Sequence, residues 1–170
     1  MLNGIRIIEI EGLGPTPFAG MLFSDLGAEV TVIHRKDKSD FSNHKNILDR
    51  GKRSIELNLK DPDDLVVAKK LIIQSDAVIE GFRPGVMEKL GLGPNEFSEN
   101  PSLVFGRMTG WGQDGPKSKQ AGHDLNYIGL SGALWFASHP NTPPFTPPAL
   151  VGDVGGGALY LVIGVLSAIL

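Results

Sequence analysis

Short β-branched runs alternate with amphipathic segments through the first two thirds of the chain, and this alternation constrains the fold more than any other feature. Residues 5–9 and 29–33 have strand character, and residues 17–26 carry apolar side chains at helical spacing that ends at Gly27. Further strands are predicted at 54–59, 76–80 and 102–108. Further helices are predicted after Asp61-Pro62, with Leu65, Ala68, Leu71 and Ile72 on the apolar face, and over 84–90. Such alternation predicts an α/β fold, with a mostly parallel sheet covered by helices.

The turn after the first strand resembles a dinucleotide-binding loop without completing its pattern. Gly12 and Gly14 precede a predicted helix, but Pro17 stands where the third glycine of Gly-x-Gly-x-x-Gly belongs. The sequence therefore disfavours classical NAD binding by this turn. A tight turn and a turn that lines a ligand site both remain open.

Charge is unevenly distributed along the chain. The whole chain has a net charge of −3, whereas residues 35–60 contain eight Lys or Arg and four Asp or Glu, a local surplus of +4. An acidic chain argues against a nucleic-acid-binding protein. A local basic segment suits a small polyanion, such as the phosphates of coenzyme A, although a solvated loop would have the same composition.

Composition also bears on compartment and cofactors. The chain has no cysteine, which excludes disulfides and thiolate metal sites and fits a reducing compartment. The first ten residues lack the layout of a secretory signal and are predicted to form a strand. We expect a cytoplasmic protein with no metal site and no required cofactor.

The last segment, 154–170, contains no charged residue. Seventeen such residues fall short of the roughly 20 that span a bilayer. A helix that is apolar all round needs protein on every side, so we expect a buried helix of a larger protein rather than a membrane segment.

Two blocks hold the candidate catalytic residues. His123 lies in Gly122-His123-Asp124-Leu125-Asn126-Tyr127, and Asp153 opens Asp153-Val154-Gly155-Gly156-Gly157. Taken from spacing alone, a histidine beside a glycine is more often structural, and an aspartate before an apolar helix is most simply an N-cap. A catalytic pairing of the two needs further support.

That support is a resemblance along essentially the whole chain. The sequence resembles the α-methylacyl-CoA racemases of the family III CoA-transferase group. Besides the two blocks above, the matching residues are Gly27-Ala28, Arg35, Gly51 to Ser54, Leu57 to Lys60, Arg83 to Val86, Gly91 to Pro94, and Thr109 to Gln113. No single piece is decisive, but the ordered set is specific.

The resemblance implies a fold, a reaction and a catalytic pair. The implied fold is the N-terminal part, residues 1–170, of a large Rossmann-like CoA-binding domain, in an interlocked homodimer whose chains are about twice this length. The implied reaction is inversion of the α-carbon of a 2-methylacyl-CoA thioester through an enolate. His123 and Asp153 are the implied bases, and backbone N–H groups at the start of the helix after Asp153 are expected to meet the enolate oxygen.

The resemblance also implies contacts with the CoA part of the substrate. Arg35 is expected to face the phosphates, and Arg83 either contacts CoA or braces its own loop. The full set of predicted contacts is Gly14, Pro15, Arg35, Leu57, Asn58, Leu59, Lys60, Gly81, Phe82, Arg83, Lys89, Gly122, Asp124, Leu125, Asn126 and Tyr127. No nucleic-acid or membrane partner is expected.

Two rival functions remain open. Family III CoA-transferases keep the aspartate as an acyl-accepting nucleophile but do not share the histidine, so a transferase would use Asp153 alone. The second rival is an inactive fragment that only binds CoA. Since fold alone does not choose among these functions, His123 is the residue that favours the racemase.

Overall fold

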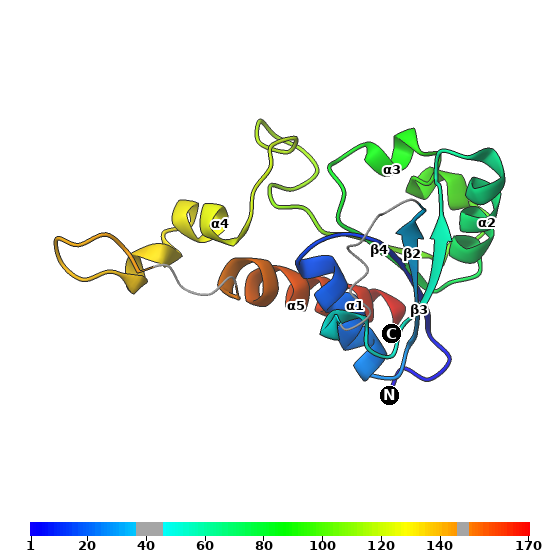
Figure 1. The fold of residues 1–170 in the computed structure, drawn as a ribbon, viewed down its shortest axis with the longest axis horizontal. Helices are drawn as coiled ribbons and strands as arrows, with labels where there is room; N and C mark the ends of the chain where they lie inside the picture. The colour runs from blue at the N-terminus through cyan, green and yellow to red at the C-terminus, as the bar shows by residue number, and fades with distance from the viewer. Residues whose placement is uncertain (37–45, 146–149) are drawn as a thin grey trace.

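The computed structural model describes residues 1–36, 46–145 and 150–170. Its centre is a five-stranded sheet in which every neighbouring pair is parallel (Figure 1). The strands are β1 (Arg6–Ile10), β2 (Glu29–Arg35), β3 (Arg53–Leu57), β4 (Ala77–Glu80) and β5 (Val104–Arg107), in the order β3-β2-β1-β4-β5. The predicted α/β, Rossmann-like fold is confirmed.

Two apolar clusters cover the two faces of the sheet. On one face, α1 (Pro15–Asp25) and α5 (Leu159–Ile169) place Phe23 and Val165 against Ile7. On the other, α2 (Pro62–Ile73), α3 (Val86–Lys89) and the short η2 (Pro94–Phe97) place Ile72 and Met87 against the neighbouring strand residues. Burial on both faces explains why the strands are almost continuously apolar.

The predicted helix boundaries are close to the observed ones. Asp61 caps α2 by accepting from the N–H groups of Asp63 and Asp64, at 3.0 and 3.3 Å. Gly27 follows the end of α1 with φ of 98°, the left-handed conformation expected there. Its N–H donates to the carbonyl of Ser24, which closes the helix.

The strand order reverses between β1 and β4. In open parallel sheets, a reversal leaves a crevice outside the carboxyl ends of the two strands, where ligands bind. The loop after β1 leads into α1, and the loop after β4 holds Gly81, Phe82 and Arg83. These two loops form the floor of the candidate site.

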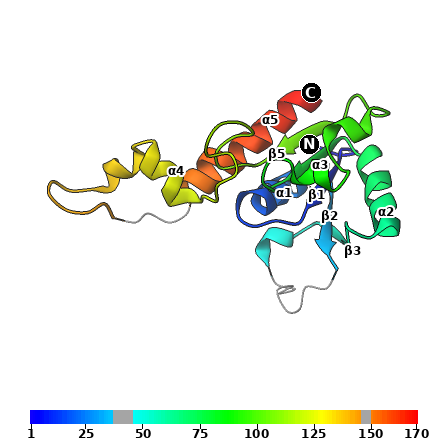
Figure 2. The ribbon, with the colours of Figure 1, turned by 90° about the horizontal axis from the view of Figure 1, so that it is seen from above.

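The chain after β5 leaves the sheet as an arm. Figures 1 and 2 show α4 (Asp124–Leu130) and the short η3 (Ala133–Ala137) projecting to one side, before the chain returns through η4 (Val151–Ala158) into α5. A further single turn, η1 (Ile47–Asp49), precedes β3. The arm places α4 beside the start of η4.

The helix that contains Asp153 begins earlier than predicted. It runs without interruption from Val151, as the wide π-helical segment η4, to Ile169, so Asp153 lies in its first turn and is not its N-cap. Among the described residues, it is the one helix long and apolar enough to cross a membrane by length and composition. Ala158, Val162 and Val165 are buried against the sheet, whereas Tyr160 and Ile163 are exposed. The expectation of a fully covered helix therefore holds for one face only.

Candidate active site

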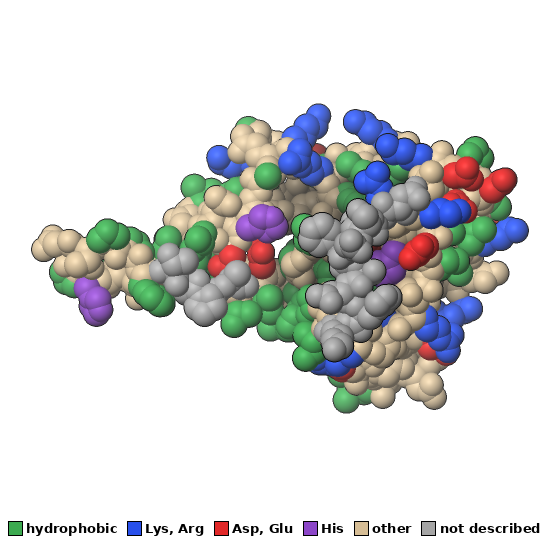
Figure 3. Space-filling model, viewed as in Figure 1, with side chains coloured by type: hydrophobic (Ala, Val, Ile, Leu, Met, Phe, Trp, Pro, Cys, Tyr) green, Lys and Arg blue, Asp and Glu red, His purple; other side chains and the backbone are tan. Residues whose placement is uncertain are grey.

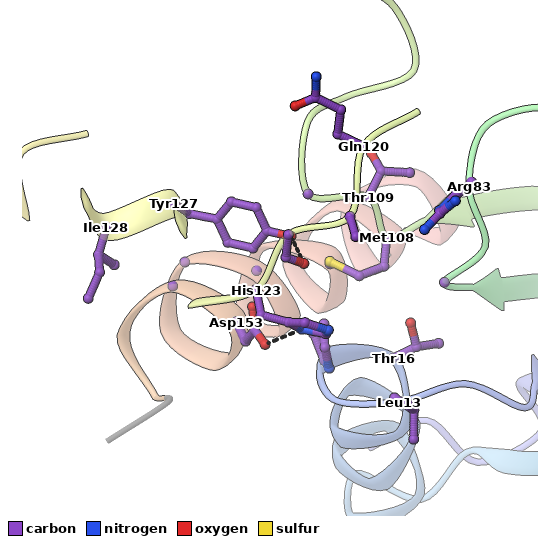
Figure 4. A pocket seen from close by; sticks show the side chains of 18 of the residues that line it. Leu13, Thr16, Arg83, Met108, Thr109, Gln120, His123, Tyr127, Ile128 and Asp153 are labelled. Atoms are coloured by element: carbon purple, nitrogen blue, oxygen red, sulfur yellow. Dashed lines mark hydrogen bonds and ion pairs between the residues drawn. The ribbon is translucent and has the colours of Figure 1, made fainter. Parts of the chain in front are cut away.

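A cavity of about 600 Å³ opens at the carboxyl ends of β1, β4 and β5. Its walls are the first turn of α1, the loops after β4 and β5, α4, and the first turns of η4 (Figure 4). In the space-filling view, Lys and Arg side chains gather along the upper edge of the face in view (Figure 3). Because the strand order reverses between β1 and β4, the cavity lies at the switch point of the sheet, where a ligand site is expected.

His123 and Asp153 meet in this cavity from two different elements. His123 is the N-cap of α4, and its Nδ1 lies 3.3 Å from Oδ2 of Asp153 in the first turn of η4 (Figure 4). The histidine side chain is 73% exposed and the aspartate side chain 12% exposed. The structure thus brings together the two predicted bases, which lie thirty residues apart in the sequence.

The backbone that carries Asp153 is fixed by Asp124. One carboxylate oxygen of Asp124, a buried residue, accepts from the N–H groups of Gly152 and Asp153 at 2.6 and 2.7 Å. A carboxylate at a helix start satisfies N–H groups that have no partner within the helix. The N–H of Gly155 donates to the carbonyl of Leu150 at 2.8 Å. The N–H groups of Gly152, Asp153 and Gly155 therefore already have partners within the protein.

An aromatic pair forms the wall on the α4 side. The rings of Trp111 and Tyr127 pack edge to face with centroids 5.0 Å apart, and the Tyr127 hydroxyl donates to the carbonyl of Gly122. A Cβ atom at residue 110 would lie 1.9 Å from that hydroxyl, so only glycine fits there. Burial, and to a lesser degree the charge of Asp153, raises the pKa of Tyr127. The phenol therefore stays protonated and holds the loop before His123.

Glu80 is a buried carboxyl group at the end of β4, directly before Gly81 of the cavity floor. Its Oε2 accepts from the N–H of Phe82 at 2.6 Å, which shapes the turn through Gly81. Burial raises the pKa of Glu80 to about 7, and the Phe82 hydrogen bond and the charge of Arg107 only partly oppose this shift. A carboxyl group that titrates near neutrality is a feature of functional sites, although structural networks also produce it.

The predicted contact residues divide into two groups. Pro15, Gly81, Phe82, Arg83, Gly122 and Tyr127 line the cavity with His123 and Asp153. Gly14 lies beside it, since a Cβ atom there would be 3.7 Å from the Asp153 carboxylate. Outside the cavity wall lie Arg35 at the end of β2, the run Leu57, Asn58, Leu59 and Lys60 after β3, Lys89 on α3, and Asp124, Leu125 and Asn126 on α4. Contact between these outer residues and CoA stays a prediction.

Several of the outer residues have partners within the protein. Leu57 is packed in the core, Asp124 holds Gly152 and Asp153, and the side-chain oxygen of Asn126 accepts from the N–H of His123 at 2.9 Å. The side chains of Leu57 and Asp124 are therefore buried within the protein, and contact of these residues with CoA stays a prediction. Asn126 orients the loop that carries His123.

The basic segment is partly neutralised by acids from other elements. Lys36 pairs with Asp64, Arg50 with Asp25, and Arg53 with Glu29. Lys52 is buried in an ion pair with Glu9, its Nζ 2.7 Å from Oε2. The charged residues of the basic segment at positions 37, 38, 40 and 45 lie outside the described residues. The charge that can meet a polyanion is therefore smaller than the sequence count indicates.

Sequence reasoning missed Thr16 and Glu80, and it did not predict the hydrogen bonds of Asp124 to Gly152 and Asp153. A usable signal existed for Glu80, since an acid that ends an otherwise apolar parallel strand is expected to be buried. Thr16 offered only a weak signal, as the one residue between Pro15 and Pro17 in a helix start. The role of Asp124 depends on a contact across 28 residues, which no local pattern encodes.

Comparisons with known proteins agree with this geometry. Residues 2–170 match the family model described as CoA-transferase family III. The mouse protein named alpha-methylacyl-CoA racemase is 42% identical over 170 residues, which cover 99% of this chain and 44% of the mouse protein. The human succinyl-CoA:glutarate CoA-transferase is 30% identical over 182 residues, covering 99% of this chain and 41% of the human one.

Solved structures give the same result. A CAIB/BAIF family protein from Brucella suis superposes with a TM-score of 0.89 at 27% identity, covering 99% of this chain and 48% of the other. The chain belongs to CoA-transferase family III, a family of enzymes that act on acyl-CoA substrates. It spans less than half the length of the two curated relatives named above.

Proposed function

We propose that this chain carries the catalytic pair of a racemase that inverts the α-carbon of 2-methylacyl-CoA thioesters. The observation that carries the proposal is the meeting of His123 and Asp153, 3.3 Å apart, in a cavity at the switch point of the sheet. Both residue types exchange protons, and a thioester activates its α-hydrogen for removal by a base.

Inversion requires one base on each face of the α-carbon. One group removes the hydrogen while the other delivers one to the opposite face, and they exchange roles in the reverse direction. A separation of 3.3 Å leaves no room for a carbon atom between the two groups. His123, the more exposed partner, therefore turns away from Asp153 when the substrate enters, whereas Asp153 stays fixed through Asp124.

The relatives support the racemase over the transferase. Identity to the mouse and human racemases is 42%, compared with 30% to the human succinyl-CoA:glutarate CoA-transferase. The alternative function is CoA transfer between carboxylic acids, with Asp153 attacking the thioester to form a mixed anhydride. The position of Asp153 on the cavity wall also suits that reaction, but it leaves His123 without a role.

The remaining expectations belong to the same proposal. The substrate binds as its CoA thioester, the reaction needs no other cofactor and no metal, and the complete natural protein acts as a homodimer in the cytoplasm. No group of three or more His, Cys, Asp or Glu suited to a metal occurs among the residues that the structure describes. The proton transfers are assigned to His123 and Asp153 alone.

A two-product assay on the complete natural protein tests the proposal. Incubation with (R)-2-methylacyl-CoA is expected to yield the S epimer, with no dependence on an added carboxylic acid. The Asp153→Ala variant is expected to lose this conversion. If (R)-2-methylacyl-CoA does not epimerise but gives up its CoA to succinate, the transferase alternative is correct.

A further inference from the structure

The first turn of α1 has few hydrogen-bond donors, and Thr16 supplies most of them. Pro15 and Pro17 flank Thr16 and have no N–H group. The side chain of Thr16 lines the cavity floor (Figure 4). Within residues 15–17, the hydrogen-bond donors are therefore the N–H and the hydroxyl group of Thr16.

The Thr16 hydroxyl is buried and has no hydrogen-bond partner in the part of the chain that the structure describes. It packs against Gly81 in the loop after β4, since a Cβ atom at residue 81 would lie 2.6 Å from Oγ1. A buried hydroxyl that makes no hydrogen bond loses its hydration without compensation. Such a group at a cavity wall points to a ligand that supplies the missing acceptor.

Thr16 lines the same cavity as His123 and Asp153. Two residues before it, Gly14 lies beside the carboxylate of Asp153. The N–H groups of Gly152 and Asp153 already donate to Asp124. The developing negative charge of an enolate needs hydrogen-bond donors aimed at its oxygen. Thr16 lines the same cavity, and its hydroxyl is a donor without a partner among the described residues.

We propose that Thr16 is a substrate-binding residue whose hydroxyl donates a hydrogen bond to a carbonyl oxygen of the bound acyl-CoA. This inference rests on the proposed function. Threonine in a helix occupies two χ1 rotamers, and the bond requires the one that moves the hydroxyl from its position against Gly81 toward the cavity. The acceptor is either the thioester carbonyl or an amide carbonyl of the pantetheine arm.

The test compares Thr16→Val, which keeps the shape, with Thr16→Ser, which keeps the hydroxyl, in the complete natural protein. The probe is isobutyryl-CoA, a 2-methylacyl thioester whose α-carbon is not a stereocentre. Loss of one hydrogen bond is expected to raise the Kd of Thr16→Val roughly tenfold, while Thr16→Ser stays within about twofold of the wild type. The Tm of unliganded Thr16→Val is expected to equal or exceed that of the wild type, because the buried unpaired hydroxyl is gone.

Binding of free CoA distinguishes the two acceptors. A matching loss of CoA affinity in Thr16→Val assigns the bond to the pantetheine arm, and unchanged CoA affinity assigns it to the thioester. The inference is overturned if Thr16→Val binds isobutyryl-CoA as the wild type does. A loss of equal size in both variants, or a lower Tm of unliganded Thr16→Val, overturns it as well, since either result indicates a packing role.

The same probe keeps this inference separate from the proposed reaction. If the wild type binds isobutyryl-CoA but never exchanges its α-hydrogen with solvent, the reaction is wrong, and the Kd comparison still decides the role of Thr16. If exchange occurs and Thr16→Val binds normally, only the Thr16 inference fails. A wild type that does not bind isobutyryl-CoA overturns both.

Discussion

At the scale of single residues, Glu80 gives the protein a predicted pH dependence of stability. Its pKa is raised from 4.5 to about 7 in the folded protein, so between these values the folded state binds a proton that the unfolded state releases. Stability therefore falls as pH rises from about 4.5 to about 7. The pKa shift corresponds to a loss of unfolding free energy on the order of 3 kcal/mol over this pH range.

Glu80→Gln is expected to remove this pH dependence, because glutamine has no charge to bury. Urea unfolding at pH 5 and pH 8 measures it. The variant should gain more stability over the wild type at pH 8 than at pH 5, and the exposed Glu99→Gln should show no such difference. An equal effect of Glu80→Gln at both pH values would show that the carboxyl titrates normally in the folded protein.

Asp124 is predicted to act on the reaction through Asp153. Asp124→Ala leaves the N–H groups of Gly152 and Asp153 without their buried acceptor, which should cost about 2 kcal/mol of unfolding free energy. Because Asp153 then loses its fixed position, we expect α-hydrogen exchange at saturating substrate to fall at least roughly tenfold. The measurements are urea unfolding and exchange kinetics, with the exposed Asp114→Ala as control. Wild-type kinetics in Asp124→Ala would contradict the positioning role.

At the scale of elements, the packing of α1 on β1 depends on a buried ion pair. Glu9 on β1 and Lys52 before β3 are both almost fully buried, and the Lys52 ammonium also donates to the carbonyl of Pro17 in α1 at 3.0 Å. Burial raises the pKa of Glu9, and the charge of Lys52 opposes the shift. The pair therefore connects the sheet, the helix and the segment before β3.

Two glycine substitutions test this connection. A Cβ atom at residue 20 would lie 1.8 Å from the Glu9 carboxylate, so Gly20→Ala should separate the pair and cost roughly 3 kcal/mol. At Gly164 on α5 a Cβ atom meets nothing within 4 Å, so Gly164→Ala should stabilise by about 0.5–1 kcal/mol through helix propensity. Chemical denaturation measures the free energy of unfolding of the two variants. Equal effects would show that the Glu9–Lys52 pair can move aside without cost.

The elements were also what the sequence predicted best. All five strands, the caps of α1 and α2 and the parallel sheet follow from local patterns, because period and capping chemistry act within a few residues. Both catalytic candidates were found by resemblance, and spacing alone favoured a structural role for each. The start of η4 was not predicted, since Asp153 looks like a cap until Asp124 is placed beside it. The ion pair of Lys52 with Glu9 and the packing of Thr16 against Gly81 depend on contacts between distant segments.

At the scale of the whole molecule, the arm and α5 expose apolar surface. Trp135, Phe136 and Phe145 on the arm are 76%, 91% and 73% exposed, and Tyr160 and Ile163 on α5 are also exposed. Contiguous apolar patches mark association surfaces. We predict that residues 1–170, prepared alone, self-associate and have no racemase activity.

Light scattering of residues 1–170 over a range of concentrations measures this association. The double variant Trp135→Ser/Phe136→Ser should shift the association to higher concentration. Ile47→Ser, at an exposed apolar residue far from the arm, should not. A 1–170 chain that stays monomeric and racemises its substrate would contradict the prediction.

In the proposed racemase, His123 and Asp153 each serve one face of the α-carbon. The most direct measurement is deuterium incorporation from heavy water into (R)- and (S)-2-methylacyl-CoA by His123→Ala and by Asp153→Ala. We predict that each variant loses net racemisation but still labels one enantiomer, a different one for each variant, since exchange on one face needs only one base. Loss of all labelling in Asp153→Ala together with wild-type labelling and racemisation in His123→Ala would contradict it.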